Sequence, residues 1–175
     1  LAMIVPWTFG QQVTDPSASN PNYDSQKAVQ VSQSRNATPA KQADPTPISR
    51  NITGENGGSA SRTAPCWIPR DGSYTGVPRN DDGSLGPITI PFAFQLYGTT
   101  YNQVYINTNG NLTFTGPYSS FTASGFPFSV PMVAPFWGDV DTRSCGGQIW
   151  YKVNPTNMIV TWENVGYYPT SCDKV

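Results

Sequence analysis

The sequence contains no histidine, so the commonest general base and metal ligand of proteins is missing. Catalysis by Ser-His-Asp or Cys-His groups, and zinc binding through histidine, are therefore excluded within this chain. Charged residues are also scarce, at 12% of the 175 residues, and 10 Lys+Arg nearly balance 11 Asp+Glu. Proteins that bind nucleic acid carry a basic surface, so nucleic acid is not an expected partner.

The apolar run at residues 1–10 is too short to span a bilayer, so no membrane span is expected in this fragment. A small residue, Gly10, closes the run, and a polar stretch follows at once. This order is typical of the end of a signal-peptide core before its cleavage site. We interpret residues 1–10 as the end of a signal peptide and expect a secreted or cell-surface protein. An N-terminal strand is the alternative.

Cysteine is rare, with Cys66, Cys145 and Cys172 as its three occurrences. None of them has CxxC spacing, which makes a zinc or redox site a weak interpretation. In a secreted protein two of the three would pair. We favour a disulfide between Cys145 and Cys172, because both flank the same predicted strand region. Three buried free thiols are the alternative.

Residues 11–64 lack aromatic side chains apart from Tyr23 and are rich in Ser, Thr, Asn, Gln, Pro and Ala. The apolar residues in this stretch are scattered without a period. Such a segment cannot bury enough apolar surface to offset the entropy lost on ordering. We therefore predict a disordered linker or stalk over residues 11–64.

Trp, Phe, Tyr, Ile and Val become frequent from residue 65 onward. The hydrophobic pattern predicts strands at residues 88–94, 104–106, 112–114, 148–153 and 158–162. Asn109-Gly110 suits a type I′ turn between the second and third strands, and residues 154–157 form a turn between the last two. Two hairpins at short spacing indicate an all-β domain over residues 65–175, an antiparallel sandwich or a partly open barrel.

Four carboxylates lie in turn-like segments of this domain. Asp81 and Asp82 belong to an acidic turn, and Asp139 and Asp141 are two residues apart, on one side of an extended backbone. Oxygen ligands of this kind make a calcium site a candidate, although the EF-hand pattern is not met. The alternative is structural: the acidic turn forms an Asx turn, and Asp139 or Asp141 accepts hydrogen bonds from Arg143 or loop amides. Apart from calcium, no cofactor is expected.

A carbohydrate-active enzyme is the catalytic alternative, because glycoside hydrolysis needs only two carboxylates astride the scissile bond. Asp139, Asp141 and Glu163 are the candidates near aromatic residues. We predict no catalytic residue, however, and interpret the aromatic residues of the apolar runs as core.

The aromatic residues fall into two groups by position. Trp137, Trp150 and Trp162 lie in apolar runs, which favours a place in the core over a sugar-binding surface. Tyr167 and Tyr168 follow a glycine in a predicted loop, so this pair is the better candidate for contact with a ligand.

Several segments of the domain together carry a family resemblance. They are PFWGDVDTR at residues 135–143, NDDGS at 80–84, YINTNGNLTF at 105–114 and VTWENVGYY at 160–168. In order and spacing they resemble the nidogen-like (NIDO) domain family, which occurs in nidogen, mucin-4 and alpha-tectorin. The chain also resembles secreted surface proteins of Bacteroidetes-type bacteria. The resemblance covers roughly residues 66–175.

This resemblance implies an extracellular, β-rich domain that takes part in adhesion or matrix assembly, with no catalytic activity assigned to the domain itself. Family members continue past the position of Val175 with further strands, so it also implies that the β domain is truncated at its C-terminus. We expect a non-catalytic adhesion or surface-assembly module that binds protein or glycan. The alternatives are a fragment of a carbohydrate-active enzyme and a structural scaffold for missing domains.

Overall fold

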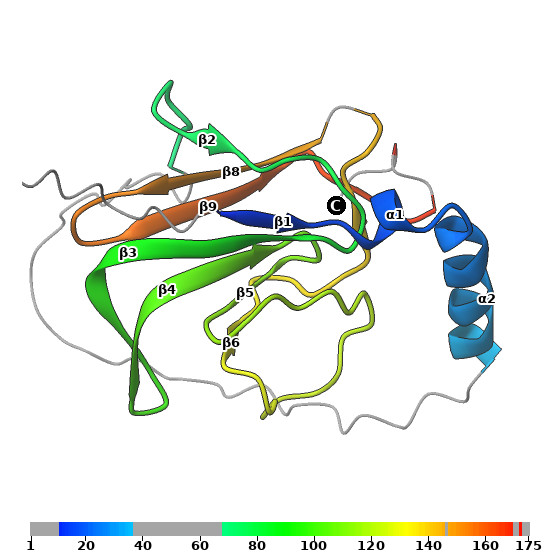
Figure 1. Ribbon diagram of the computed structural model, residues 1–175, viewed down its shortest axis with the longest axis horizontal. Coiled ribbons are helices and arrows are strands. Elements are labelled where there is room, and N and C mark those ends of the chain that lie inside the picture. Colours follow the sequence, from blue (N-terminus) through cyan, green and yellow to red (C-terminus); the bar gives the residue numbers. More distant parts are fainter. Residues whose placement is uncertain (1–10, 37–67, 146, 170–171, 173–175) are drawn as a thin grey trace, which may run out of the picture.

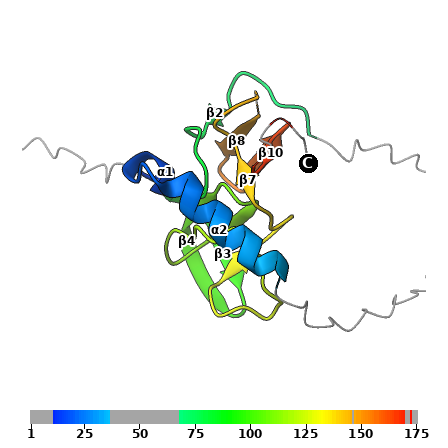
Figure 2. The ribbon, with the colours of Figure 1, turned by 90° about the vertical axis from the view of Figure 1, so that its right-hand side faces the viewer.

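The computed structural model describes residues 11–36, 68–145, 147–169 and 172. Two antiparallel sheets pack face to face, with strand orders β1-β3-β4-β5-β6 and β2-β8-β9 (Figure 1). A short pair, β7-β10, lies at one end (Figure 2). The strands are β1 (Gln12–Thr14), β2 (Thr75–Gly76), β3 (Ser84–Leu96), β4 (Thr99–Asn107), β5 (Asn111–Thr113), β6 (Met132–Val133), β7 (Val140–Asp141), β8 (Gln148–Val153), β9 (Met158–Glu163) and β10 (Gly166–Tyr167). The helices are α1 (Pro16–Ser19) and α2 (Tyr23–Asn36).

The two sheets share one apolar core, which makes the fold a sandwich and confirms the predicted all-β class. The sheets are not closed into a barrel. The buried apolar side chains come from both sheets and from the segments around β7 and β10. They are Val77, Leu85, Ile88, Ile90, Val104, Ile106, Phe114, Val140, Ile149, Tyr151 and Val165. Alternation along the strands places them on the inner faces.

The β8–β9 hairpin forms where the sequence predicts it. Val153 pairs with Met158, and the backbone N–H of Asn154 donates to the carbonyl of Asn157 at 2.8 Å. The other edge of β8 pairs with β2. The pattern of apolar residues thus determines this hairpin locally, without help from distant parts of the chain.

The β4–β5 hairpin also forms as predicted, but its turn differs from the predicted type. Asn107 pairs with Asn111, so the loop holds three residues, and Gly110 has a positive φ of 79° whereas Asn109 does not. A three-residue loop with a left-handed glycine at its end replaces the type I′ turn. The physical reason is tertiary, because the Asn109 side chain is fixed in hydrogen bonds to neighbouring loops.

The type I′ turn instead joins β3 to β4, where sequence reasoning predicted no turn. Leu96 pairs with Thr99, and the two residues between them, Tyr97 and Gly98, have φ values of 50° and 80°. Tyrosine rarely adopts a left-handed conformation, so the sequence gives little sign of this turn. It brings the predicted strands at 88–94 and 104–106 together in one long hairpin.

The tryptophans predicted as core residues are half-buried at its margin. Trp162 packs against the core, and its indole N–H donates to the carbonyl of Thr108 at 3.1 Å. The guanidinium carbon of Arg70 lies over the ring of Trp150, 4.1 Å from the ring centroid. Trp137, between β6 and β7, belongs to a separate aromatic cluster with Tyr118 and Phe128 of the β5–β6 connection. Large indoles with a polar N–H often sit at such margins.

Residues 11–36 form a strand and two helices, which corrects the predicted linker for this part of the chain. We call them the N-terminal arm. β1 pairs with the start of β3, while α1 and α2 lie across one end of the sandwich, beside β7 and β10 (Figure 2). Asp15 caps α1, with Pro16 at its first position, a helix-start signal that the composition argument overlooked. Residues 1–10, 37–64 and Cys66 lie outside the described residues. The prediction of a signal peptide over residues 1–10 and of a linker over residues 37–64 therefore concerns parts of the chain that the structure does not describe.

None of the helices in the described part of the chain is both long and apolar enough to cross a membrane.

Two glycines with nearly equal φ values offer a matched test of the hairpins. At Gly98 a Cβ would meet nothing within 4 Å, whereas at Gly110 it would clash with the backbone carbonyl of Phe136. We expect Gly98→Ala to lower the free energy of unfolding by about 1–2 kcal/mol, the cost of a left-handed alanine. Gly110→Ala should cost clearly more, because the clash adds to that strain. Urea denaturation of both variants checks this, and equal losses would contradict it.

Candidate functional site

Three loops of the β domain are joined by polar side chains at the end of the sandwich covered by α2. The Asn109 amide donates to an Asp82 oxygen at 2.6 Å, and its own oxygen accepts from the Val140 N–H at 2.9 Å. The Thr142 hydroxyl donates to the Asn80 carbonyl at 2.9 Å and accepts from the Asn80 N–H at 2.9 Å. These side chains are buried. They hold the acidic turn against the start of β7.

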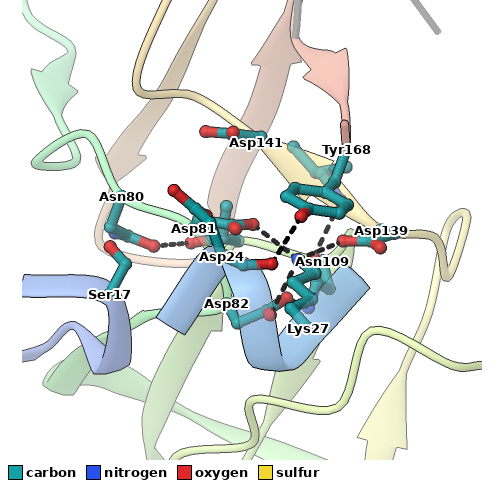
Figure 3. Close-up of polar contacts among 12 residues, drawn as sticks. Ser17, Asp24, Lys27, Asn80, Asp81, Asp82, Asn109, Asp139, Asp141 and Tyr168 are labelled. Atoms are coloured by element: carbon teal, nitrogen blue, oxygen red, sulfur yellow. Dashed lines mark hydrogen bonds and ion pairs between the residues drawn. The ribbon is translucent and has the colours of Figure 1, made fainter. Parts of the chain in front are cut away.

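This arrangement brings three carboxylates together around one lysine. The Lys27 Nζ lies 2.9 Å from an oxygen of Asp81, 2.9 Å from one of Asp82 and 2.6 Å from one of Asp139 (Figure 3). One oxygen from each carboxylate lies within 4.8 Å of the others. The Lys27 side chain is buried, with 2% of the residue exposed.

Aromatic rings complete the surroundings of the ammonium group. Its nitrogen lies 4.4 Å from the centroid of the Tyr168 ring and 4.9 Å from that of Phe121. The faces of such rings attract cations, most strongly where water is excluded. The hydroxyl of Tyr23 donates to Asp82 from the arm. We call Asp81, Asp82, Asp139, Phe121 and Tyr168 the lysine socket.

Asp141 points away from Lys27 (Figure 3) and binds a second cation instead. The Arg143 guanidinium donates to both oxygens of Asp141, at 3.0 and 2.9 Å, and to Asp81 at 3.2 Å. The same guanidinium reaches Asp24 of α2 at 2.9 Å, and the Tyr168 hydroxyl donates to the Asp24 carbonyl at 2.9 Å. Asp24 therefore fixes the arm at a second point, in a more exposed position.

The buried carboxylates outnumber the cations beside them, and the pKa values reflect this. Burial, followed by repulsion from Asp82, raises the pKa of Asp81 to about 7 against the attraction of Lys27. Burial likewise raises the pKa of Asp139 to about 6. Burial is the largest single influence on Lys27 and opposes its charge. Attraction by the carboxylates together outweighs it and raises the pKa of Lys27. The cluster thus takes up protons near neutral pH.

Three of the four residues predicted as calcium ligands meet in the socket, and the fourth, Asp141, accepts from Arg143. Lys27 stands where a cation would bind those three, so calcium and Lys27 would exclude each other. Sequence reasoning missed Lys27, because a single lysine in a polar stretch gives no signal. It also missed Asn80 and Asn109, whose role is to hold the acidic turn.

The other candidate residues lie outside the lysine socket, except for Tyr168. Glu163 pairs with Arg70 at 3.2 Å on the second sheet, with both side chains about one-third exposed. Cys145 and Cys172 form a disulfide with a Cα–Cα distance of 4.8 Å, the pair favoured by the sequence. Tyr167 is 40% exposed, whereas the ring of its neighbour Tyr168 contacts the Lys27 ammonium in the socket.

Comparison with known proteins identifies the family of the domain. The family model described as NIDO related matches residues 60–174. The chain belongs to this family. The match confirms the resemblance drawn from the sequence motifs, and the family model covers strands β2 to β10 and every residue of the socket.

Curated relatives of the NIDO related chain include alpha-tectorin and nidogen. Chicken (Gallus gallus) alpha-tectorin is 33% identical over 131 residues, which covers 59% of this chain and 6% of the relative. Human (Homo sapiens) alpha-tectorin is 31% identical over 121 residues, 54% of this chain and 6% of the relative. Nidogen of Drosophila melanogaster is 27% identical over 135 residues, 54% of this chain and 10% of the relative. The chain thus matches a small part of each, and no solved structure matches it significantly.

We expect the free energy of unfolding to fall as the pH rises from about 4 to 7. The unfolded chain releases protons from Asp81 and Asp139 near the ordinary pKa of 3.8, whereas the folded protein holds them to about 7 and 6. The state that binds more protons is stabilised as the pH falls. Asp139→Asn removes one of the two groups and should flatten the dependence by up to about 1.4 kcal/mol per pH unit.

Urea denaturation at several pH values measures this slope, and Asp71→Asn provides the control. Hydrogen bonds from Ser73 lower the pKa of this exposed carboxyl to about 2, so above about pH 5 it is ionised in the folded and in the unfolded chain, and the slopes are compared there. The control should keep the slope of the unchanged protein. An Asp139→Asn variant with the same slope would refute the assignment of a raised pKa to Asp139.

Calcium binding by Asp81, Asp82 and Asp139 remains a prediction, and replacing Lys27 tests it. In Lys27→Met the three carboxylates lose their cation, and calcium would restore the balance of charge. We expect millimolar calcium to raise the melting temperature of this variant by several degrees over a chelator, and that of the unchanged protein much less. Lys152→Met, which breaks an exposed pair with Asp71, is the control. A folded Lys27→Met variant whose melting temperature does not change with calcium would contradict the calcium site.

Proposed function

We propose that this chain is an extracellular module that binds protein or glycan and catalyses no reaction. The family carries the proposal: the chain belongs to the NIDO related family and shares 27–33% identity with alpha-tectorin and nidogen over more than half its length. The disulfide between Cys145 and Cys172 supports an oxidising, extracellular location.

The contacts of the carboxylates support a non-catalytic role. A glycosidase needs one carboxyl group as proton donor and a second one facing the sugar. Asp139 contacts the ammonium of Lys27, Asp141 contacts the guanidinium of Arg143, and Glu163 pairs with Arg70. Each of these candidates therefore serves a contact inside the protein. A role as scaffold for further domains would leave these contacts unchanged.

Two exposed tyrosines mark opposite ends of the sandwich as candidate contact surfaces. Tyr167 lies on β10, beside the arm, and is 40% exposed. Tyr97 stands at the β3–β4 turn, away from α2, and is 80% exposed (Figure 1). Exposed aromatic side chains are enriched where proteins contact partners. We assign ligand contact to Tyr167, as the sequence suggested.

The test is an array of matrix proteins and glycans probed with the whole chain, in calcium and in chelator. We expect saturable binding to one class of ligand and no turnover of it. Tyr167→Ala should weaken that binding at least about tenfold, the effect of losing roughly 1.4 kcal/mol. Tyr97→Ala, at the opposite end, is the matched control and should bind unchanged.

A blank array with a folded protein would contradict the binding role and favour a scaffold. Loss of binding in Tyr97→Ala instead of Tyr167→Ala would move the contact surface to the β3–β4 turn. Hydrolysis of a glycan that Asp139→Asn or Glu163→Gln abolishes would overturn the non-catalytic assignment.

A further inference from the structure

The N-terminal arm is held to the β domain by contacts between residues far apart in the sequence. β1 pairs with β3 over Gln12–Thr14 and Ser84–Gly86. Lys27 enters the socket formed by residues 54 and 112 positions away, and Arg143 reaches back 119 positions to Asp24. The arm therefore docks as a separate piece onto a surface that the β domain provides.

The docking of α2 is polar, and Lys27 is the side chain that it buries. Among residues 23–33 of α2, Lys27 is the one buried side chain, and Val29 is 54% exposed. The helix thus contributes little apolar surface to the core. Buried ion pairs gain little net stability, because the desolvation cost offsets much of the attraction. The socket therefore determines the position of α2 but adds little free energy to the docked state. Release of the arm should cost less free energy than unfolding of the sandwich.

The socket is specific for a primary ammonium group on an extended stem. Three carboxylates surround the nitrogen at 2.6–2.9 Å, and two aromatic rings lie over it. The bound group itself, Lys27, shows what the socket accepts. Around it, Arg143 donates to the side chain of Asp24 and the Tyr168 hydroxyl donates to its backbone carbonyl, three positions earlier on the same helix. The complementary partner is therefore a lysine on a helix with an acidic residue one turn before it.

A second copy of this chain carries that partner. Residues 37–67 connect the arm to the β domain, and a connection of this length reaches up to roughly 100 Å when extended. Chain connectivity therefore permits the arm to dock on its own β domain or on that of a neighbour. Every contact is the same in the two cases, which is the condition for exchange of an element between identical chains.

We propose that two copies of this chain associate by exchanging their N-terminal arms, with Lys27 of each copy in the lysine socket of the other. The socket adjoins the ligand contact assigned to Tyr167, because the next residue, Tyr168, belongs to the socket. The two proposals are read out separately: the mass of the dimers reports exchange of the arm, and binding on the array reports ligand contact.

Two complementary variants of the full chain test the exchange. Lys27→Ala keeps the socket but lacks the lysine, and the Asp81→Asn, Asp82→Asn, Asp139→Asn triple variant keeps the lysine but has a neutralised socket. Neither variant alone can place a lysine in a charged socket. In a mixture, the lysine of the socket variant can enter the intact socket of the Lys27→Ala chain. With one variant labelled with ¹⁵N and a chelator present, native mass spectrometry should show mixed dimers at least tenfold above the like dimers of either variant.

Wild-type chains provide a test that does not depend on the folding of the variants. A mixture of ¹⁴N and ¹⁵N wild-type chains, refolded together at high concentration, should give dimers of mixed mass, and the Lys27→Ala chain refolded alone should give at least tenfold fewer. Lys152→Ala, which loses a half-buried lysine outside the socket, should dimerise as the wild type does. Wild-type chains that stay monomeric would overturn the proposal. So would dimers that Lys27→Ala forms as readily, because they would use another surface.

Discussion

Neutral side chains joining three loops are the interaction on which the rest of this site depends. Asn80, Asn109 and Thr142 hold the acidic turn, the β4–β5 loop and the start of β7 in contact. Buried polar groups must find partners, and each of these groups finds one in another loop. The carboxylates of the acidic turn consequently point to one spot, although nearby like charges repel. Without this scaffold of amides and hydroxyls, Asp81, Asp82 and Asp139 would separate into solvent.

The convergence of charge explains why a lysine from a distant segment is buried. Carboxylates gathered at the end of the sandwich require a cation, a proton or both. Lys27 and Arg143 supply two cations, and the raised pKa values of Asp81 and Asp139 indicate that protons supply the remainder near neutral pH. The same requirement accounts for the order of the arm. Its helix lacks an apolar face, and Lys27 anchors it to the domain.

The apolar core and the charged end therefore serve different purposes in this NIDO related domain. The core fixes the two sheets and supplies most of the stability, as apolar burial generally does. The charged end adds specificity, since it accepts one helix in one position. A module built in this way can keep its sandwich intact while the partner at its charged end changes.

The sequence by itself determined the all-β class, the β4–β5 and β8–β9 hairpins and the family, because these rest on alternation, turn residues and motifs that are local in the chain. It also pointed to Asp81, Asp82 and Asp139 as a group, through the chemistry of acidic turns. Only the tertiary structure decided that Lys27 lies among them and that residues 11–36 are folded. The physical reason is that the arm docks through contacts to residues far away in the sequence: the pairing of β1 with β3, the pair of Asp24 with Arg143, and the buried contact of Lys27 to residues 54 and 112 positions away. Such contacts leave no periodic apolar pattern in the sequence, and composition alone therefore predicted a linker.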